Sequence, residues 1–286
     1  MTILVLGTGI VGSAAAWDLR RRGFAVTVAD VDGESVERVA NAHGATPATI
    51  DVADARDLMD LMSMHELVVS AVPYHFGYAV ASAALATGTH HLDFGGNPSV
   101  VAAQRRLHDD AVTNGVMFVP DCGLAPGLAN VIAEDIIATA DEGMIDSIQM
   151  RVGALPQEPV GALGYQLAFN PAGLINEYAE PCEVLIERRH AKVQPLSHFE
   201  EVPWADRGVL EAFSTAGGTS TMTYAHEGRV RSLEYKPLRY PGHGVVFRAL
   251  YEMGLFDQTP HRFGGVELAP RAVLIDGLTR TLPRDG

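Results

Sequence analysis

The stretch ILVLGTGIVG, residues 3–12, joins an apolar run to a glycine pattern of the form G-x-G-x-x-G at Gly7, Gly9 and Gly12. The apolar run predicts a buried strand, and the residues that follow predict a helix. In that setting Gly7 permits a tight turn, Gly9 lets a pyrophosphate approach the backbone, and Gly12 lets the helix lie close to the strand. The alternative is that the glycines only ease the turn. We expect a dinucleotide-binding loop.

The helix after this loop presents its free amides to the phosphates, so Ile10 and Val11 are counted with the glycines as cofactor contacts. Val11, Ala15 and Leu19 are also expected to form the inward stripe of that helix, because their spacing places them on one face. The three arginines at 20–22 lie in its last turn, where cations suit the helix dipole.

From Thr2 to about Pro120 one rhythm repeats: a short apolar run, a turn signal, and a longer segment with helical periodicity. A crossover that holds a helix returns the chain to the same end of a sheet, so such strands run parallel. The fold class expected here is α/β, a Rossmann-type doubly wound parallel sheet. The strands are ILVLG, FAVTVAD, ATIDV, LVVSAV, HHLDF and VMFVP, and the helices are Ile10–Arg22, Glu34–His43, Asp54–Ser63, His75–Thr87 and Ser99–Asn114.

Asp30 ends the second of these strands, at the place where a carboxylate hydrogen-bonds a ribose 2′-hydroxyl. With Asp32 beside it, a 2′-phosphate would meet two negative charges, so NAD is predicted rather than NADP. Asp51 is a candidate for the adenine amino group, or a plain aspartate at a strand end. Val72 and Pro73 follow the fourth strand and are expected beneath the nicotinamide half of the cofactor, or to form a capping turn.

After a predicted helix at 126–140 the alternation stops, and SIQMRVGAL, YQLAF, CEVLIERRHAKVQPL and VLEAFST predict strands and a hairpin. This pattern predicts a second, mixed-sheet α+β domain. Helical periodicity returns at 244–255 and 270–282. We therefore expect residues 1–125 and 241–286 to form the dinucleotide-binding domain, and residues 126–240 a domain for substrate binding and oligomerisation.

Composition narrows the function classes. The formal net charge of −14 and the sequence pI near 5.1 oppose binding of a nucleic-acid backbone. Two cysteines form no disulfide framework, the first residues lack a basic region, and no apolar run is long enough for a bilayer-spanning helix, so a cytoplasmic protein without membrane contact is expected. No spacing typical of a metal site is visible.

Several motifs together resemble the saccharopine dehydrogenase-like group of amino-acid oxidoreductases, most closely its lysine 6-dehydrogenase branch. They are GTGIVG, DFGGN, DCGLAPG, VGALPQEPVGALGYQLAFNPAGLINEY, EAFSTAGGTSTM and EYKPLRYPGH, which cover essentially the whole chain. The resemblance implies NAD-dependent oxidative deamination of the side-chain amine of L-lysine, giving a semialdehyde that cyclises to a piperideine carboxylate. It also implies an amino-acid substrate and a homo-oligomer. Saccharopine reductases typically carry GLDPG where this chain has Ala125, which favours the lysine 6-dehydrogenase branch.

That chemistry requires removal of a proton from an ammonium group whose ordinary pKa is about 10.4. Candidates are Asp93, Lys236 and His243, with Tyr240 in the same segment as His243. The chain has only two lysines against nineteen arginines. Because a desolvated lysine can lose its proton and an arginine does not, Lys236 is the favoured proton acceptor, with a surface lysine as the alternative.

The substrate's α-carboxylate requires a fixed cation, and Arg239 can bind it with two parallel hydrogen bonds. Tyr165 and Thr215 are candidates for lining the cleft, or are surface hydroxyl groups. Cys122 follows a strand and is expected either to line the pocket or to be a small buried residue. Asp93 is alternatively a cap for the loop after its strand, and His243 a residue at a helix entry.

Three functions stay open at this point. The first is lysine 6-dehydrogenase, and the second is a dehydrogenase for saccharopine or another amino acid or diamine. The third is a shortened paralogue that binds NAD without catalysis, because relatives usually continue well past the helix at 270–282.

Overall fold

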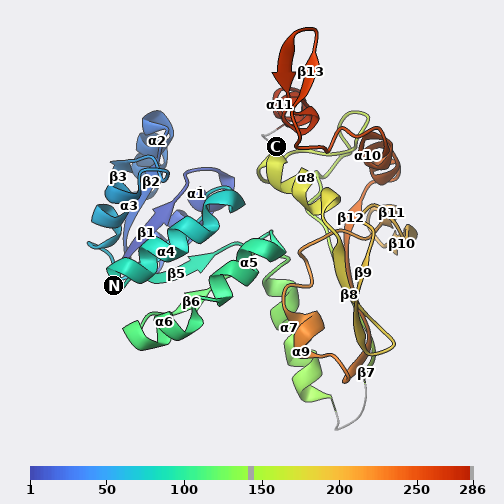
Figure 1. Ribbon diagram of the computed structural model, residues 1–286, viewed down its shortest axis with the longest axis horizontal. Coiled ribbons are helices and arrows are strands. Elements are labelled where there is room, and N and C mark those ends of the chain that lie inside the picture. Colours follow the sequence, from blue (N-terminus) through green and yellow to red (C-terminus); the bar gives the residue numbers. More distant parts are fainter. Residues whose placement is uncertain (141–144, 284–286) are drawn as a thin grey trace. The chain divides into compact units, whose positions relative to one another are not determined.

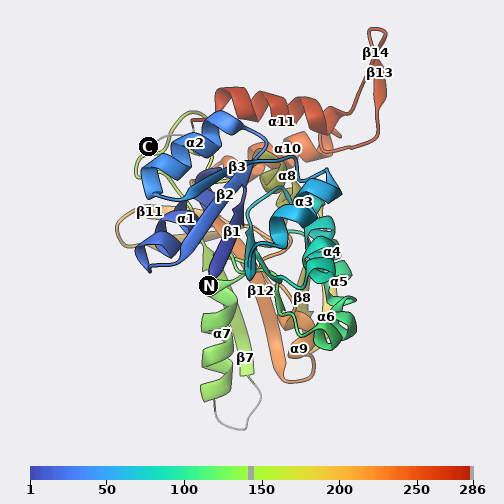
Figure 2. The ribbon, with the colours of Figure 1, turned by 90° about the vertical axis from the view of Figure 1, so that its left-hand side faces the viewer.

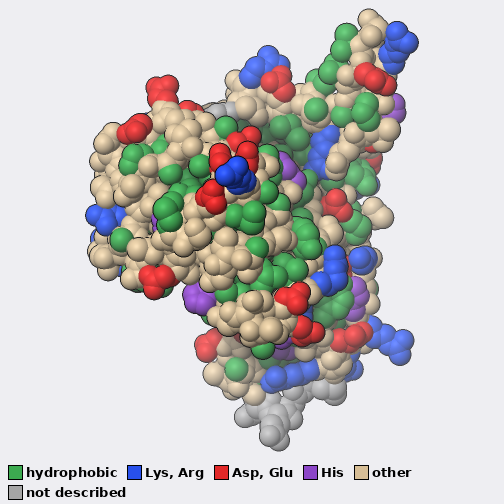
Figure 3. All heavy atoms as spheres, turned by 60° about the vertical axis from the view of Figure 1, so that its left-hand side comes forward, with side chains coloured by type: hydrophobic (Ala, Val, Ile, Leu, Met, Phe, Trp, Pro, Cys, Tyr) green, Lys and Arg blue, Asp and Glu red, His purple; other side chains and the backbone are tan. Residues whose placement is uncertain are grey.

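The computed structural model describes residues 1–140 and 145–283, and the chain divides into two compact units, Met1–Gly123 and Leu124–Gly286 (Figure 1). Each unit has its own sheet. Among the described residues, no helix has both the length and the apolar character needed to span a bilayer. On the face drawn in Figure 3, Lys and Arg side chains are scattered among acidic ones.

The first unit contains a six-stranded parallel sheet in the order β3-β2-β1-β4-β5-β6, which confirms the predicted doubly wound fold. Its strands are β1 (Thr2–Leu6), β2 (Ala25–Asp30), β3 (Thr46–Thr49), β4 (Leu67–Ser70), β5 (His90–Asp93) and β6 (Phe118–Val119). Its helices are α1 (Ile10–Arg21), α2 (Gly33–His43), α3 (Ala55–Met62), α4 (Gly77–Thr87), α5 (Pro98–Arg105) and α6 (His108–Asn114), with the short helix η1 (Tyr74–Phe76) before α4.

Helices cover both faces of this sheet, α1 and α2 on one side and α3 and α4 on the other (Figure 2). Alternate residues of β1 show why. Ile3 and Val5 pack with residues of α1 and α2, whereas Leu4 and Leu6 pack with residues of α3 and α4. A strand buried on both faces is apolar throughout, so the run ILVL was a sufficient signal.

Three local predictions in the first unit were wrong. The third strand ends at Thr49 because Asp51 forms a turn, in which its side chain accepts a hydrogen bond from the amide of Ala53. The helix expected at 99–114 is two helices, since bonds of the i to i−3 type close α5 at Arg105. Val11 is 37% exposed and does not belong to the inward stripe of α1, whereas Ala15 and Leu19 pack against the core beside the buried residues Gly12 and Ala16.

The second unit contains a mixed sheet in the order β10-β11-β12-β8-β9, with β7 paired in parallel to β12, which confirms the second domain type. Its strands are β7 (Ile145–Val152), β8 (Cys182–Ile186), β9 (Arg189–Val193), β10 (Glu200–Trp204), β11 (Gly208–Ala212) and β12 (Val230–Arg239), and β13 (His261–Phe263) and β14 (Val266–Leu268) form a separate hairpin. Its helices are α7 (Leu128–Thr139), α8 (Pro171–Ala179), α9 (Met222–Ala225), α10 (His243–Glu252) and α11 (Pro270–Thr281).

The second unit corrects the expected assignment of residues 241–286, of which 284–286 lie outside the described residues. Phe247 of α10 and Leu278 of α11 share one buried cluster with Leu174 and Tyr178 of α8. The apolar faces of α10 and α11 are therefore buried within the second unit, and both helices belong to that unit rather than to the first.

The segment YQLAF, residues 165–169, is not a strand. Tyr165 and Leu167 are buried, but their amides bond to the carbonyls of Val160 and Pro283 rather than to a neighbouring strand. Burial of every second residue therefore occurs here in a segment that is not part of a sheet.

Candidate functional site

The glycine loop of the first unit is shaped by close backbone packing. Gly7 has φ +94°, and a Cβ atom there would lie 2.7 Å from the carbonyl oxygen of Ala71. A Cβ atom on Gly12 would lie 1.9 Å from the carbonyl oxygen of Gly7. Gly9 differs, because nothing lies within 4 Å of a Cβ atom built on it. The first and third glycines are required by the fold, whereas the second leaves open space beside the loop.

The N-terminus of α1 is suited to a pyrophosphate. No side chain caps the helix at Gly9, and its first turn contains no acidic residue. The first amides of any helix have no intrahelical acceptor, and they attract anions. Ile10 is 56% exposed, so it lies at the surface beside these amides. The residues present therefore fit the phosphate groups of a dinucleotide.

Asp30 is held at the end of β2 next to the same loop. Its Oδ2 atom accepts hydrogen bonds from the amide and the hydroxyl group of Thr8, at 2.7 and 3.1 Å. Its Oδ1 atom accepts one from the amide of Asp32 at 3.2 Å. These contacts fix the carboxylate beside the dinucleotide loop, where the sequence predicted a ribose contact.

The other expected cofactor contacts lie at the ends of neighbouring strands. Asp51 is exposed in its turn, and Val72 and Pro73 are half-buried directly after β4 and Ala71. Their roles toward adenine and nicotinamide stay predictions.

Asp93 organises the loops at the ends of β5 and β6. One carboxylate oxygen accepts the amides of Gly95 and Asp121, at 2.8 and 3.2 Å, and the other accepts the side-chain amide of Gln104 at 2.6 Å. His91 lies 3.9 Å from the same carboxylate, and burial lowers the pKa of this histidine while the charge of Asp93 opposes that effect. These contacts favour the loop-capping role of Asp93 over proton transfer.

Cys122 is joined to the same loops, since its amide donates to the carbonyl of Asp93 at 2.7 Å. Cys122 is exposed, so the alternative of a small buried residue was wrong. Partial burial of the thiol group raises its pKa, and the charges of Asp93 and Asp121 raise it further. The thiol form is therefore stabilised, which is unsuited to a nucleophile. Its role as a pocket residue stays a prediction.

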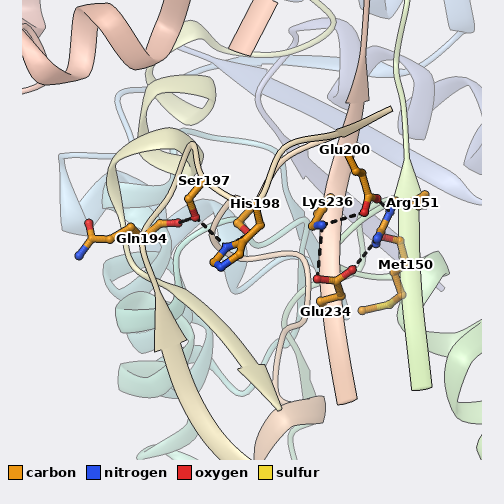
Figure 4. Close-up of polar contacts among 9 residues, drawn as sticks. Met150, Arg151, Gln194, Ser197, His198, Glu200, Glu234 and Lys236 are labelled. Atoms are coloured by element: carbon orange, nitrogen blue, oxygen red, sulfur yellow. Dashed lines mark hydrogen bonds and ion pairs between the residues drawn. The ribbon is translucent and has the colours of Figure 1, made fainter. Parts of the chain in front are cut away.

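Lys236 belongs to a four-residue ion cluster in the second unit, Arg151–Glu200–Lys236–Glu234 (Figure 4). Its ammonium group is 2.9 Å from Glu200 and 3.5 Å from Glu234. Arg151 contacts the second oxygen of each carboxylate, at 2.6 and 2.5 Å. Two carboxylates thus hold the ammonium group of a side chain that is 6% exposed, an arrangement that favours a structural cation over a proton acceptor.

Arg239, Tyr178 and His243 form a buried hydrogen-bonded chain. Arg239 Nε donates to Tyr178 Oη at 2.9 Å, and Tyr178 Oη lies 3.0 Å from His243 Nε2. The Nδ1 atom of His243 lies 3.1 Å from the carbonyl oxygen of Leu163. Because Tyr178 accepts from the guanidinium, its own proton points to Nε2, and Nδ1 carries the proton donated to Leu163.

His243 is neutral in this arrangement. Burial lowers its pKa to about 3, with the positive charge of Arg239 acting in the same direction. The histidine therefore accepts a hydrogen bond from Tyr178 at neutral pH and carries no charge.

The remaining expected substrate contacts lie around this chain or apart from it. Tyr165 stacks its ring beneath Arg239, 5.2 Å from the guanidinium carbon, and packs against His243. Thr215 is buried, and within the described residues its hydroxyl oxygen has no hydrogen-bond partner. Tyr240 instead donates to the carbonyls of Pro156 and Gln157. The structure thus brings Tyr165, Arg239 and His243 together, whereas the hydroxyl group of Tyr240 is bonded outside this group.

The sequence interpretation missed Tyr178, which joins Arg239 to His243, and its neighbour Glu177, on which the charge of Arg239 acts. Both lie on α8, which starts with Asn170 as cap and Pro171 in its first turn. That cap and proline were a recognisable helix-start signal in NPAGLINEY.

A model of the saccharopine dehydrogenase NADP binding domain matches residues 3–119, and a model of the saccharopine dehydrogenase C-terminal domain matches residues 123–285. The chain is 29% identical over 182 residues to the NADP+, L-glutamate-forming saccharopine dehydrogenase of Pyricularia oryzae, covering 61% of this chain and 39% of that one. It is 26% identical over 273 residues to the enzyme of the same name from Saccharomyces cerevisiae, covering 88% of this chain and 58% of the relative.

Among solved structures, the chain is similar to the apo L-Glu-forming saccharopine dehydrogenase from Saccharomyces cerevisiae. The TM-score is 0.73 at 21% identity, over 90% of this chain and 59% of that structure. At this identity the likeness concerns the fold, and the chain spans less than two thirds of the length of these relatives. Since the two domain models together match residues 3–119 and 123–285, the chain belongs to the saccharopine dehydrogenase family.

Proposed function

We propose that this chain is an NAD-dependent dehydrogenase that oxidises a carbon–nitrogen bond of an amino acid. The observation that carries the proposal is the loop of the first unit, in which Gly9 leaves open space beside uncapped helix amides and Asp30 is fixed next to them. This combination suits the pyrophosphate and ribose of a pyridine nucleotide. When bound there, the nicotinamide ring supplies a hydride acceptor.

Preference for NAD follows from charge. Asp30 and Asp32 lie together after β2, and the amide of Asp32 bonds to Asp30. A carboxylate accepts a hydrogen bond from a ribose hydroxyl but repels a phosphate at the same position. We therefore propose NAD, although the relatives in the comparison are named for NADP+.

L-Lysine, oxidised at its side-chain amine, is the proposed substrate. Oxidation removes a hydride from C6 and a proton from the ammonium nitrogen, giving an iminium. One water then adds, ammonia leaves, and the resulting semialdehyde cyclises with its own α-amine and releases one water. Arg239 supplies a fixed cation for the α-carboxylate, with Tyr165 stacked on it. The presence of Ala125 in GLAPG supports lysine over saccharopine as substrate.

Saccharopine is the second candidate, because the relatives from Pyricularia oryzae and Saccharomyces cerevisiae are saccharopine dehydrogenases. Both candidate substrates would lose a hydride from the carbon next to the reacting nitrogen. They differ in that nitrogen, which is a primary amine in lysine and a secondary amine in saccharopine.

The test is formation of NADH or NADPH by the full chain with L-lysine, saccharopine, L-ornithine or agmatine. We expect turnover with NAD+ and L-lysine. Turnover only with saccharopine and NADP+ would contradict both the substrate and the cofactor assignment. Binding of NAD in a fluorescence titration, without turnover of any of the four, would favour a binding protein over a dehydrogenase.

A further inference from the structure

Glu177 is a carboxylate without a partner inside the polar network of the second unit. It lies on α8 beside Tyr178, and its side chain is partly accessible. Within residues 1–140 and 145–283, its carboxylate makes no hydrogen bond and no ion pair. Because the side chain keeps access to solvent and no protein group of the described residues pairs with it, the carboxylate is free to bind a ligand cation.

Arg239 lies close to Glu177, because its Nε atom donates to the hydroxyl group of the neighbouring residue Tyr178 at 2.9 Å, and its positive charge acts on the Glu177 carboxylate without an ion pair. Arg239 uses Nε for Tyr178 and Nη1 for the carbonyl of Leu238, so its Nη2 atom is not used in either bond. Thr215 adds a third unsatisfied group, since its hydroxyl oxygen is buried without a partner among the described residues. The next residue, Ala216, donates its amide to the backbone carbonyl of Glu177 at 2.9 Å, which places Thr215 close to α8.

We propose that Glu177 binds the α-ammonium group of the amino-acid substrate while Arg239 binds its α-carboxylate, so that the pair recognises a zwitterionic head group. The assignment rests on the proposed amino-acid substrate class. In an α-amino acid the ammonium group and the carboxylate group are bonded to the same carbon. A carboxylate and a guanidinium that are neighbours without direct contact match that arrangement, with the hydroxyl of Thr215 available as a further hydrogen-bonding group.

This assignment makes Glu177 a specificity residue. Hydrogen bonds to charged groups typically contribute about 1.5–3 kcal/mol, so the α-ammonium is worth roughly a tenfold to a hundredfold in affinity. A carboxylic acid without an α-amine keeps only its contact with Arg239. The site thus selects α-amino acids over simple amines and acids, and it leaves the reacting side-chain nitrogen to other groups.

Burial also makes the site sensitive to pH. It raises the pKa of Glu177 to about 7, with the charge of Arg239 opposing this effect. Below that pH the carboxyl group is neutral and cannot pair with an ammonium, so affinity for the head group rises with pH through about 7. The other titratable groups that face it stay in one charge state in this range, because burial raises the pKa of each tyrosine and lowers that of the histidine. The groups that interact electrostatically with Glu177 are Arg239, Tyr165, Tyr178 and Tyr235, and the histidine is His243, which lies 3.0 Å from the hydroxyl group of Tyr178.

The probe is L-norleucine, which carries the head group but no side-chain amine, compared with hexanoate, which lacks the α-amine. Binding to the full chain is measured by titration calorimetry from pH 6 to pH 8. We expect L-norleucine to bind at least tenfold more tightly than hexanoate at pH 8, and its affinity to fall toward pH 6. Glu177→Gln should remove at least tenfold of the L-norleucine affinity and the pH dependence, while hexanoate binding stays unchanged.

Glu201→Gln is the matched control, because Glu201 is exposed on β10 of the same unit. Equal binding of L-norleucine by wild type and Glu177→Gln would overturn the inference, as would an equal loss of both ligands. A pH-independent affinity in the wild type would overturn it without any variant. If L-norleucine binds through Glu177 but no amino acid is oxidised, the proposed function fails and the head-group site stands. If wild type and Glu177→Gln oxidise L-lysine at the same rate and with the same KM, the head-group site is refuted and the proposed function stands.

Discussion

Replacing Lys236 by methionine tests whether this lysine is a structural cation. The ammonium group of Lys236 lies between Glu200 and Glu234, and Arg151 holds the outer oxygens of both carboxylates. Methionine fills a similar volume without the charge. The variant Lys236→Met therefore removes two ion pairs and leaves one arginine to compensate two carboxylates.

The expected cost follows from burial. Removing one partner of a fully buried ion pair costs about 3–5 kcal/mol. Here the lysine side chain is 6% exposed, but Glu200 and Glu234 are 33% and 24% exposed, so water screens the remaining carboxylates. We expect a loss of about 2 kcal/mol in the free energy of unfolding of the second unit, below the fully buried range. A second change, Glu234→Gln, should restore about half of that loss by removing one uncompensated charge.

The chain offers a direct assay, since Trp17 lies in α1 and Trp204 in β10. In a Trp17→Phe background, Trp204 fluorescence during urea denaturation reports unfolding of the second unit, because Trp204 lies on β10, the strand that also carries Glu200. A loss below about 0.5 kcal/mol would contradict the structural role, because that is the usual size of a surface change. A large fall in turnover with unchanged stability would instead support Lys236 as the proton acceptor.

Three further predictions concern the cofactor loop and the buried titratable groups. Gly9→Ala should preserve stability, because its Cβ atom meets no protein atom, but it should weaken NAD binding at least tenfold in a fluorescence titration, because that atom occupies the space expected for the pyrophosphate. Gly12→Ala should also destabilise the first unit in urea, because its Cβ atom would clash with the backbone. Asp30→Asn should weaken NAD binding about tenfold and strengthen NADP binding, as measured by the same titration. His243 has a folded pKa of about 3 against an ordinary 6.5, so its contribution to stability is lost as pH falls from 6.5 toward 3, whereas the raised pKa of Glu177 makes its contribution fall as pH rises from 4.5 through about 7. Between pH 5 and 6 the two effects oppose each other, so His243→Asn should leave stability falling with pH and Glu177→Gln should leave it rising, each by about 1.4 kcal/mol per pH unit in urea denaturation, and parallel profiles would contradict both assignments.

The first unit was predictable because its signals are local. Each parallel strand is buried on both faces and is therefore an apolar run, as in Ile3 to Leu6, where every residue is fully buried. The glycine spacing between β1 and α1 is likewise contained within six residues. One error occurred where a side chain changes the local chain path, at the turn formed by Asp51, and another where backbone bonds of the i to i−3 type end a helix at Arg105.

The second unit was harder to predict because its central strand is polar. Along β12 the stretch from Tyr235 to Arg239 is buried, although it contains Lys236 and Arg239. Their burial depends on partners from other elements, Glu200 on β10 for the lysine and Tyr178 on α8 for the arginine. Such pairs are far apart in sequence, and a single sequence contains no local pattern that reveals them. Arg239 and His243 lie in one short segment and were identified as candidates. Tyr178, which joins them, is far from that segment in sequence and was therefore missed.

The rarity of lysine in this chain also has a different explanation from the one that its sequence suggested. The sequence interpretation explained the lysine at position 236 by its ability to exchange a proton. Its contacts instead require a compact cation that fits between two carboxylates, at a residue that is only 4% exposed. Arginine at this position would preserve the charge but add volume to a packed site, at a typical cost of about 1–3 kcal/mol. The planar fork is already supplied by Arg151, which contacts the same two carboxylates. Size, rather than proton exchange, is therefore the simpler reason for a lysine among nineteen arginines.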